Sequence, residues 1–336
     1  MKHLDKNKVE TLVKRVEREI NEGLLPAAQI AIGFDNKIVF SKNFGDTKPD
    51  SLFCIFSATK AVTSAASWLL MQKKVISEND LVTDYIPEFG ENGKVKITLS
   101  HLLTHTAGFP HAPFKPIEWK SKKARIRRFE QWRSFWEPGT KFEYHPSSSM
   151  YVVAEIIERA SGQNFERFVQ DHILNPLQLR NTFIGLPDDQ SSRALPIKFC
   201  GVELSQQEYE EMGFPVPPET EVTEDAVLSF NERDVQSSGI PGGGAFSNAE
   251  DMAIFYQALL HGGTNQKRVW QDDILANAKT IRNPNLKDPV FKKAANRGLG
   301  IVISGDSERN YRGFGKTNSP FAFGHNGAGG QLCWAD

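Results

Sequence analysis

The sequence predicts an α+β fold in which helices pack on an antiparallel sheet, and three observations support this class. Apolar residues repeat with a helical period from Val9 to Ile20. Two apolar runs then flank Asp35-Asn36, a two-residue turn signal, so residues 27–44 are expected to form a β-hairpin. Near the end of the chain, residues 298–304 and 321–334 again have the composition of strands.

A second helix is expected to begin near Ser57, where a serine and a lysine stand one helical turn apart. Residues three apart on a helix are neighbours, so the amine of Lys60 is expected beside the hydroxyl of Ser57. The unpaired first-turn amides stabilise negative charge near Ser57 and disfavour a protonated lysine. This is the geometry of an activated nucleophile, but Ser-x-x-Lys alone is a weak motif that also fits an N-cap serine beside a solvated lysine. The helix itself is indicated by apolar residues at helical spacing, Val62, Ala65, Ala66, Leu69 and Leu70.

The next segments are short. Residues 81–89 contain a proline and are expected to be a loop-like connection, and 98–105 has the pattern of a short capped helix that closes at Gly108. His101 and His105 are four apart on this helix, a spacing that metal sites use. No Glu stands between them in the His-Glu-x-x-His arrangement and no third ligand is evident, so a structural role is favoured over a metal.

Residues 115–133 are strongly basic, with three tryptophans interleaved or nearby. A nucleic-acid surface and a solvated helical excursion both fit this composition, and the second is favoured because the whole chain is nearly neutral. The stretch is also suited to steering anionic substrates or to pairing with the acidic residues of 208–224. Its basic residues are Lys115, Lys120, Lys122, Lys123, Arg125, Arg127, Arg128 and Arg133, and the tryptophans are Trp119, Trp132 and Trp136.

The middle of the chain is expected to be mainly helical. Helical spacing over 152–160 ends at Ser161-Gly162, and another helix over 165–173 stops before Pro176. Residues 186–240 lack periodicity and are expected to form a long excursion that walls a substrate cleft. Their prolines are Pro187, Pro196, Pro215, Pro217 and Pro218.

Two local signals follow the excursion. Pro241-Gly242-Gly243-Gly244 has tight-turn chemistry, and without a preceding strand or a phosphate-binding lysine it does not resemble a nucleotide loop. Ser247-Asn248-Ala249-Glu250 is a capping box that opens a helix ending at Gly262.

Composition disfavours several classes of function. The 336 residues include 40 basic and 41 acidic ones, a formal net charge of -1, which argues against a dedicated nucleic-acid binder. Cys54, Cys200 and Cys333 have no metal-ligand spacing and suggest free thiols in a reducing compartment. No metal or other cofactor is expected.

The sequence has no signal for a membrane or for export. Residues 1–8 have no apolar run behind their charges, and no stretch approaches the ~20 apolar residues of a membrane span. The chain as given is therefore expected to be soluble and cytoplasmic, with no membrane partner.

Four stretches together resemble the serine β-lactamase and penicillin-binding-protein superfamily, and within it the class C β-lactamase-like and family VIII carboxylesterase branch. The resemblance covers about residues 10–185 and 240–336. Phe56 to Lys60 matches the nucleophile motif Ser-x-x-Lys. Leu102 to Gly108 resembles a Leu-Leu-Thr-His-Thr-Ser-Gly stretch whose histidine is structural, which supports that role for His105. The other two are Phe142 to Ser147, which resembles Tyr-x-Asn and its helix, and Gly324 to Gly330, which resembles the Lys-Thr-Gly or His-x-Gly strand.

The resemblance implies a serine hydrolase that forms an acyl-enzyme on Ser57. Lys60 and Tyr144 would share the proton transfers, and an ammonium beside a buried tyrosine favours the phenolate. The amides of Ser57 and Ala328 would form the oxyanion hole. The residues that would contact the substrate are His325, Asn326 and Gly327, although a strand histidine that fixes local packing is the alternative for His325.

Departures from the family pattern favour esters. Pro146 stands where Tyr-x-Asn has its asparagine, so a donor to an amide substrate is missing. His325 and Asn326 replace the lysine and the hydroxyl residue that typical β-lactamases present to a substrate carboxylate. A carboxylesterase on small esters, with weak β-lactam hydrolysis, is therefore the leading hypothesis, and a β-lactamase or D-alanyl-D-alanine carboxypeptidase relative with an ester or amide substrate is the second. A third is a non-catalytic binding or regulatory protein that retains the fold.

The resemblance also implies the domain organisation. Residues 1–60 and 240–336 would form an α/β domain built from both chain ends, with an antiparallel sheet flanked by helices. Residues 61–239 would form an inserted, mainly helical domain, with the loop excursion over 186–239, and the cleft would lie between the two. Because the family adds strands and a helix after the third motif, a chain ending at Asp336 suggests either a truncated C-terminus or an exposed sheet edge. The sequence leaves acyl-chain preference and oligomeric state open.

Overall fold

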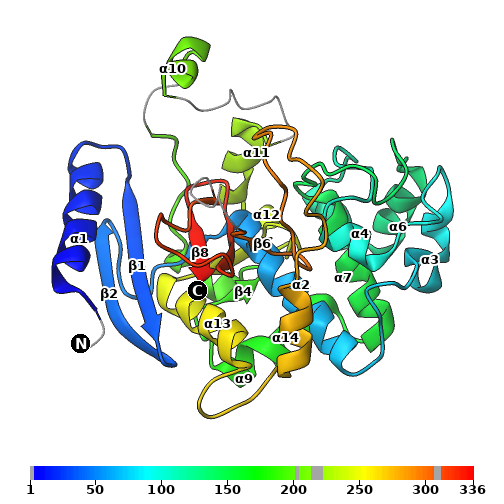
Figure 1. The fold of residues 1–336 in the computed structure, drawn as a ribbon, viewed down its shortest axis with the longest axis horizontal. Coiled ribbons are helices and arrows are strands. Elements are labelled where there is room, and N and C mark those ends of the chain that lie inside the picture. Colours follow the sequence, from blue (N-terminus) through cyan, green and yellow to red (C-terminus); the bar gives the residue numbers. More distant parts are fainter. Residues whose placement is uncertain (1–3, 201–203, 213–221, 306–311) are drawn as a thin grey trace.

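The structure, a computed structural model, describes residues 4–200, 204–212, 222–305 and 312–336. It is a mixed fold of helices and antiparallel strands, as predicted. Figure 1 shows the N-terminal helix and hairpin on one side of the molecule, a group of helices on the opposite side and helix α2 between them. Among the described residues, no helix combines the length and the apolar character that crossing a bilayer requires.

The N-terminal elements follow the predicted pattern closely. Helix α1 (Lys6–Asn21) is capped by Asp5, whose carboxylate accepts from the amides of Asn7 and Lys8. Strands β1 (Ala27–Phe34) and β2 (Lys37–Gly45) pair antiparallel around Asp35 and Asn36, whose φ angles are 51° and 58°. Positive φ at both positions is what a two-residue hairpin turn needs, and Asn and Asp tolerate it well.

Two further antiparallel sheets complete the β structure. One has the order β3-β5-β4 and the other the order β6-β7-β8. In the second sheet His325 of β7 pairs with Cys333 of β8, and β8 is an edge strand. The strands are β3 (Phe53–Cys54), β4 (Phe183–Ile184), β5 (Ala245–Ser247), β6 (Val302–Ile303), β7 (Phe323–Asn326) and β8 (Leu332–Ala335).

Helix α2 (Thr59–Gln72) is the centre of the core, and its residues from Thr59 to Leu70 are buried. It packs on α7, α14, β7 and the short 3-10 helix η1 (Phe56–Ala58) that precedes it. One hydrophobic cluster runs from Ile55 through these helices to Ala335. The α-helices up to residue 177 are α3 (Val82–Tyr85), α4 (Leu99–Leu103), α5 (Pro116–Trp119), α6 (Lys122–Gln131), α7 (Ser148–Ser161), α8 (Phe165–Val169) and α9 (Asn175–Leu177), and those after residue 240 are α13 (Ala249–His261) and α14 (Asp272–Ala278).

The excursion contains more regular structure than its lack of periodicity suggested. Some of its short helices are capped by a side chain, as at Thr223, whose hydroxyl accepts from the amide of Ala226, and at Ser205, whose hydroxyl accepts from the amide of Glu208. Three of the prolines and the acidic residues Glu219 and Glu221 lie outside the described residues. The described helices are η4 (Asp188–Arg193), α10 (Gln206–Glu211), α11 (Glu224–Leu228), η5 (Ser229–Asn231) and α12 (Arg233–Gln236).

Several boundary predictions were wrong for local reasons. Residues 81–89 are not a loop, because Asp84 caps a short helix at Leu81 and the chain continues into the 3-10 helix η2 (Pro87–Gly90). The helix after residue 165 does not stop before Pro176 but passes through a π-turn (Gln170–Leu174) into α9, which contains the proline.

Two further corrections concern the C-terminal third. The N-cap of α13 is Asn248, which accepts from the amide of Asp251 at 2.9 Å, whereas Ser247 ends β5 and its hydroxyl lies 2.8 Å from that of Thr182. Only Val302–Ile303 of the predicted strand 298–304 is a strand.

The basic stretch pairs within the helical group rather than with the described part of the acidic stretch. Arg125 is buried, and its guanidinium donates to Glu155 Oε2 at 2.6 Å, to Glu158 and to the Trp119 carbonyl at 2.9 Å. Glu155, itself fully buried, also accepts from Arg159 at 2.8 Å. These ion pairs join α6 to α7 across the core.

Replacement of Arg125 by methionine is expected to lower the free energy of unfolding by about 3–5 kcal/mol, because it leaves the buried Glu155 carboxylate short of a partner. Urea denaturation followed by circular dichroism measures the change. The matched control is Arg127→Met on the same helix, where the side chain is exposed and the change should stay within about 0.5 kcal/mol. Equal losses of unfolding free energy in both variants would contradict the stabilising role of the buried Arg125–Glu155 ion pair.

Candidate active site

Ser57 lies in the 3-10 turn that leads directly into α2, so its half-buried hydroxyl is at the N-terminal end of the central helix. The residue before it, Phe56, has φ of +43°, a conformation that costs a bulky side chain about 1–3 kcal/mol. The Phe56 ring packs edge-on against Phe230 of the excursion, with ring centroids 5.1 Å apart. This packing holds the backbone at the serine in its unusual direction.

Lys60 is fully buried in the first turn of α2, and three oxygens surround its amine. Nζ donates to the main-chain carbonyls of Pro146 at 2.6 Å and Gly242 at 2.8 Å, and it lies 3.1 Å from Ser57 Oγ. A carbonyl oxygen only accepts, so each of the two takes one N–H of the lysine. The amine is thus within hydrogen-bond distance of the hydroxyl from which, in its neutral form, it could accept a proton.

Tyr144 lies in the coil before α7, and cationic and imidazole groups surround its ring. The Lys60 amine is 5.2 Å and the Arg297 guanidinium 5.5 Å from the ring centroid. The rings of His105 and His325 are 4.7 Å and 6.1 Å away. Among the described residues, none forms a hydrogen bond with the buried Tyr144 hydroxyl. The structure therefore brings Ser57, Lys60 and Tyr144 into one cluster.

His325 is buried on β7 and lies beside Tyr144. Its Nδ1 is 2.8 Å from the carbonyl oxygen of Asn326, so in the neutral ring Nδ1 carries the proton and Nε2 is an acceptor. Asn326 is exposed at the end of the strand, and none of its described contacts is to Ser57 or Lys60.

The two residues after β7 lie next to the serine turn. A Cβ built on Gly327 would be 2.6 Å from the carbonyl oxygen of Ile55, so the close approach of the two backbones requires glycine here. Ala328 follows in an exposed turn, and within the described residues its amide donates to no acceptor. Strand β7 also packs on η1, so both amides proposed for the oxyanion hole belong to neighbouring segments.

Three buried histidines lie in or next to the site, and all three rings are neutral. His105 Nδ1 accepts from the amide of His145, while His145 Nε2 accepts from the amide of Phe109 and its Nδ1 donates to the carbonyl of Glu143. Burial lowers the pKa of His145 to about 4. Burial, and next the charge of Arg297, hold the pKa of His105 and of His325 well below the usual value.

His101 and His105, whose spacing also fits a metal site, both use their Nδ1 atoms in hydrogen bonds with backbone amides. His101 Nδ1 accepts from the amide of Thr98, and His105 Nδ1 is used as described above. Among the described residues, no group of three or more His, Cys, Asp or Glu is arranged to hold a metal ion.

Sequence reasoning missed four contributors to this site. The carbonyls of Pro146 and Gly242 belong to the backbone, which no side-chain motif reveals, although the departure at Pro146 and the glycine run at 242–244 mark both places. Phe230 belongs to the excursion that lacked any pattern. Arg297 lies outside all four motifs and has no sequence signal.

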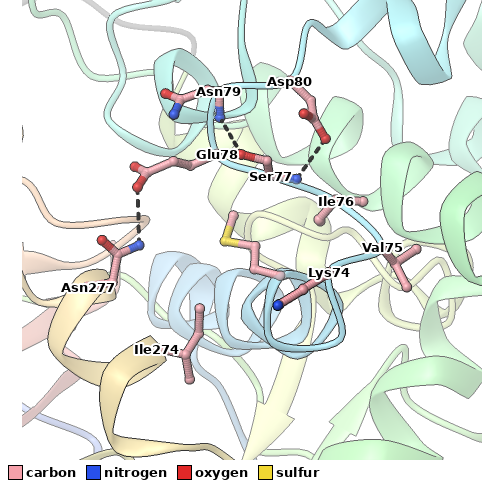
Figure 2. Close-up of a pocket in the computed structure, with 10 residues that line it drawn as sticks. Lys74, Val75, Ile76, Ser77, Glu78, Asn79, Asp80, Ile274 and Asn277 are labelled. Carbon is pink, nitrogen blue, oxygen red and sulfur yellow. Dashed lines mark hydrogen bonds between the residues drawn. The ribbon is translucent and has the colours of Figure 1, made fainter.

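A surface pocket of about 420 Å³ lies at the other end of α2 and is separate from this cluster. Figure 2 shows its lining between Lys74–Asp80 and α14, with Asn277 donating to Glu78 and Asp80 accepting from the amide of Ser77. Its carboxylates are already paired, Glu78 with Arg282 and Asp80 with the Tyr85 hydroxyl. The two carboxylates that line this pocket are therefore engaged in structural contacts.

Comparison with known proteins identifies one protein family and a relative that is similar over almost the whole chain. A family model described as Beta-lactamase matches residues 12–336. A relative from Salmonella typhimurium (strain LT2) that bears the name "Putative D-alanyl-D-alanine carboxypeptidase" is 26% identical over 376 residues, which cover 99% of this chain and 80% of the relative.

Solved structures have the same fold. A family VIII carboxylesterase superposes with a TM-score of 0.78 at 24% identity, covering 95% of this chain and 85% of its own. A penicillin-binding protein homologue from Caulobacter crescentus has a TM-score of 0.77 at 24% identity, covering 96% and 87%. EstA from Arthrobacter nitroguajacolicus Rue61a has a TM-score of 0.77 at 22% identity, covering 97% and 87%. At these identities the likeness shows the fold alone.

The buried histidines predict how stability depends on pH. The unfolded chain takes up protons on histidine below about pH 6.5, whereas folded His145, with its pKa of about 4, does not until much lower pH. Between these values the unfolded state binds more protons, so stability falls as pH falls, by about 2 kcal/mol at pH 5 from His145 alone. His105 and His325 act in the same direction.

Urea denaturation at pH 7.5 and pH 5 tests this expectation. His145→Asn should reduce the loss of stability between the two pH values, and His261→Asn, at an exposed histidine on α13, should leave it unchanged. The expectation fails if wild-type stability is the same at both pH values.

Proposed function

The chain belongs to the beta-lactamase family, as its four motifs predicted, and is a serine hydrolase; on that premise we propose that it is a carboxylesterase that forms an acyl-enzyme on Ser57 with small esters. The observation that carries this proposal is the position of the Lys60 amine, 3.1 Å from Ser57 Oγ and bonded to two main-chain carbonyls. A lysine merely solvated at a helix start would not be buried or bonded in this way.

In the proposed reaction, neutral Lys60 accepts the proton of Ser57 as Oγ bonds to the ester carbonyl carbon. The amides of Ser57 and Ala328 stabilise the oxyanion of the tetrahedral intermediate. The C–O bond to the alcohol then breaks, and the leaving oxygen receives a proton from Lys60 by way of Tyr144. Water attacks the acyl-enzyme in the same manner, which releases the acid and restores the serine hydroxyl.

The tautomer of His325 supports esters over substrates that carry a carboxylate. With Nδ1 donating to the carbonyl of Asn326, the neutral ring has only an acceptor at Nε2, and an acceptor repels a carboxylate. Pro146 adds to this preference, because its main-chain carbonyl contacts Lys60 and no side-chain amide stands there to bind an amide substrate.

The second candidate is a β-lactamase or D-alanyl-D-alanine carboxypeptidase, which the printed name of the Salmonella relative favours. Both substrates contain an amide and a carboxylate, the two groups for which this site has fewer donors. A non-catalytic binding protein is the third candidate, and the contacts among Ser57, Lys60 and Tyr144 argue against it.

Short-chain p-nitrophenyl esters are expected to be hydrolysed at least about 100-fold faster, as kcat/KM, than a chromogenic cephalosporin, because His325 presents an acceptor rather than a donor to the cephalosporin carboxylate. Ser57→Ala should lower ester kcat/KM by at least about a thousand-fold while the protein stays folded. Steady-state kinetics on both substrates measures these values.

Three results would overturn parts of the proposal. Ester hydrolysis that survives in Ser57→Ala would show that Ser57 is not the nucleophile. Rapid cephalosporin turnover, or release of D-alanine from a D-alanyl-D-alanine peptide, beside inert esters favours the second candidate. Failure of a fluorophosphonate probe to label the folded protein favours the third.

A further inference from the structure

We propose that Arg297 is a positioning residue for Tyr144, whose guanidinium fixes the phenol ring and balances the negative charge that arises on its oxygen during proton transfer. The inference rests on the proposed function. Arg297 lies outside the motifs of the family resemblance, and the inference starts from the contact of its guanidinium with the ring of Tyr144.

The guanidinium of Arg297 covers two aromatic rings of one stretch of chain. It lies 5.4 Å from the ring centroid of Phe142 and 5.5 Å from that of Tyr144. Phe142 and Tyr144 are two residues apart in the chain, and one planar cation lies over both rings. Arg297 is only 8% exposed, and cation–π contacts are stronger when water is largely excluded.

The backbone of Arg297 is anchored independently of Tyr144. Its amide donates to Asn283 Oδ1 at 2.8 Å, and Asn283 Nδ2 donates to the carbonyl of Thr104 at 3.4 Å. Thr104 directly precedes His105, which also faces the Tyr144 ring. The carbonyl of Arg297 accepts from the amide of Arg282 at 2.8 Å. These bonds fix the backbone of Arg297 independently of Tyr144, so the residue does not depend on the phenol ring for its place in the fold.

The charge of Arg297 acts on both imidazoles beside the phenol, His105 and His325. After burial, it is the largest contribution that lowers the pKa of His105 and of His325, and Lys60 acts in the same direction. Both imidazoles beside Tyr144 are thus kept neutral. The cationic groups in contact with the ring are Lys60, which takes part in proton transfer, and Arg297, which stays charged at every accessible pH.

This arrangement assigns different tasks to the two cations. Lys60 changes its charge as it accepts and returns a proton, whereas Arg297 supplies positive charge beside the phenol at every step. A fixed charge that needs no reorganisation stabilises developing negative charge more effectively in a buried site than in water. Loss of Arg297 should therefore slow the chemical step and leave the binding of an uncharged ester nearly unchanged.

The test is a double-mutant cycle on p-nitrophenyl acetate hydrolysis and on the rate of labelling by a fluorophosphonate probe. Arg297→Met is expected to lower kcat and the labelling rate at least about tenfold with KM within about twofold. In the Tyr144→Phe background the same substitution should change either rate by less than about twofold. Arg297→Lys, which keeps the charge, should recover most of the loss. If Arg297→Met does not fold, Arg297→Gln takes its place in the cycle.

The matched control is Lys279→Met, which removes another cation that contacts an aromatic ring, 5.1 Å from the centroid of Phe323, and should leave kcat unchanged. The inference is overturned if Arg297→Met slows the Tyr144→Phe enzyme as much as the wild type, if Arg297→Lys is as slow as Arg297→Met, or if kcat is unaffected. These outcomes are separate from failure of the proposed function, which Ser57→Ala reports.

Discussion

The buried amine of Lys60 joins three segments that are far apart in the chain. It bonds to Ser57 in its own helical turn, to a carbonyl 86 positions away at Pro146 and to a carbonyl 182 positions away at Gly242. A buried amine needs acceptors and buried carbonyls need donors, so the same contacts stabilise the fold and orient the amine. The segment before α7 and the glycine turn after the excursion must both be in place before Lys60 can face the serine.

Around this amine, positive charge lies beside the ring of Tyr144, and the neighbouring imidazoles remain neutral. Burial is the main reason that His105, His145 and His325 hold their neutral forms, and each has its tautomer fixed by a backbone group. The positive charge next to the tyrosine then comes from Lys60 and Arg297. This distribution of charge suits the proposed chemistry, in which an oxyanion and a phenolate develop, and an acceptor at His325 is less suited to a substrate carboxylate.

What could be predicted from sequence was local in origin. The hairpin turn at Asp35-Asn36 and the serine and lysine of the α2 helix follow from residues close to one another in the chain, and motif order then gave the family and fold. Tyr144 and His325 were named from the resemblance, and the structure brings both to Lys60. The division into two domains and the catalytic roles stay predictions.

What could not be predicted depends on contacts between distant segments. The carbonyls that hold Lys60 are backbone atoms, and Arg297 reaches Tyr144 through a tertiary contact. The helices of the excursion are too short to show periodicity and are held by packing such as that of Phe230 on Phe56. The cap of α13 was misplaced by one residue because both Ser247 and Asn248 are suitable cap residues, and the serine instead pairs with Thr182.

The most direct test of a covalent mechanism is intact-mass spectrometry of the enzyme quenched during turnover of a short-chain ester, followed by peptide mapping. An acyl-enzyme mechanism predicts a population heavier by one acyl group, with the added mass on the peptide containing Ser57 and absent in Ser57→Ala. Steady turnover with no adduct at any quench time, or an adduct on another residue with Ser57 unmodified, would contradict it.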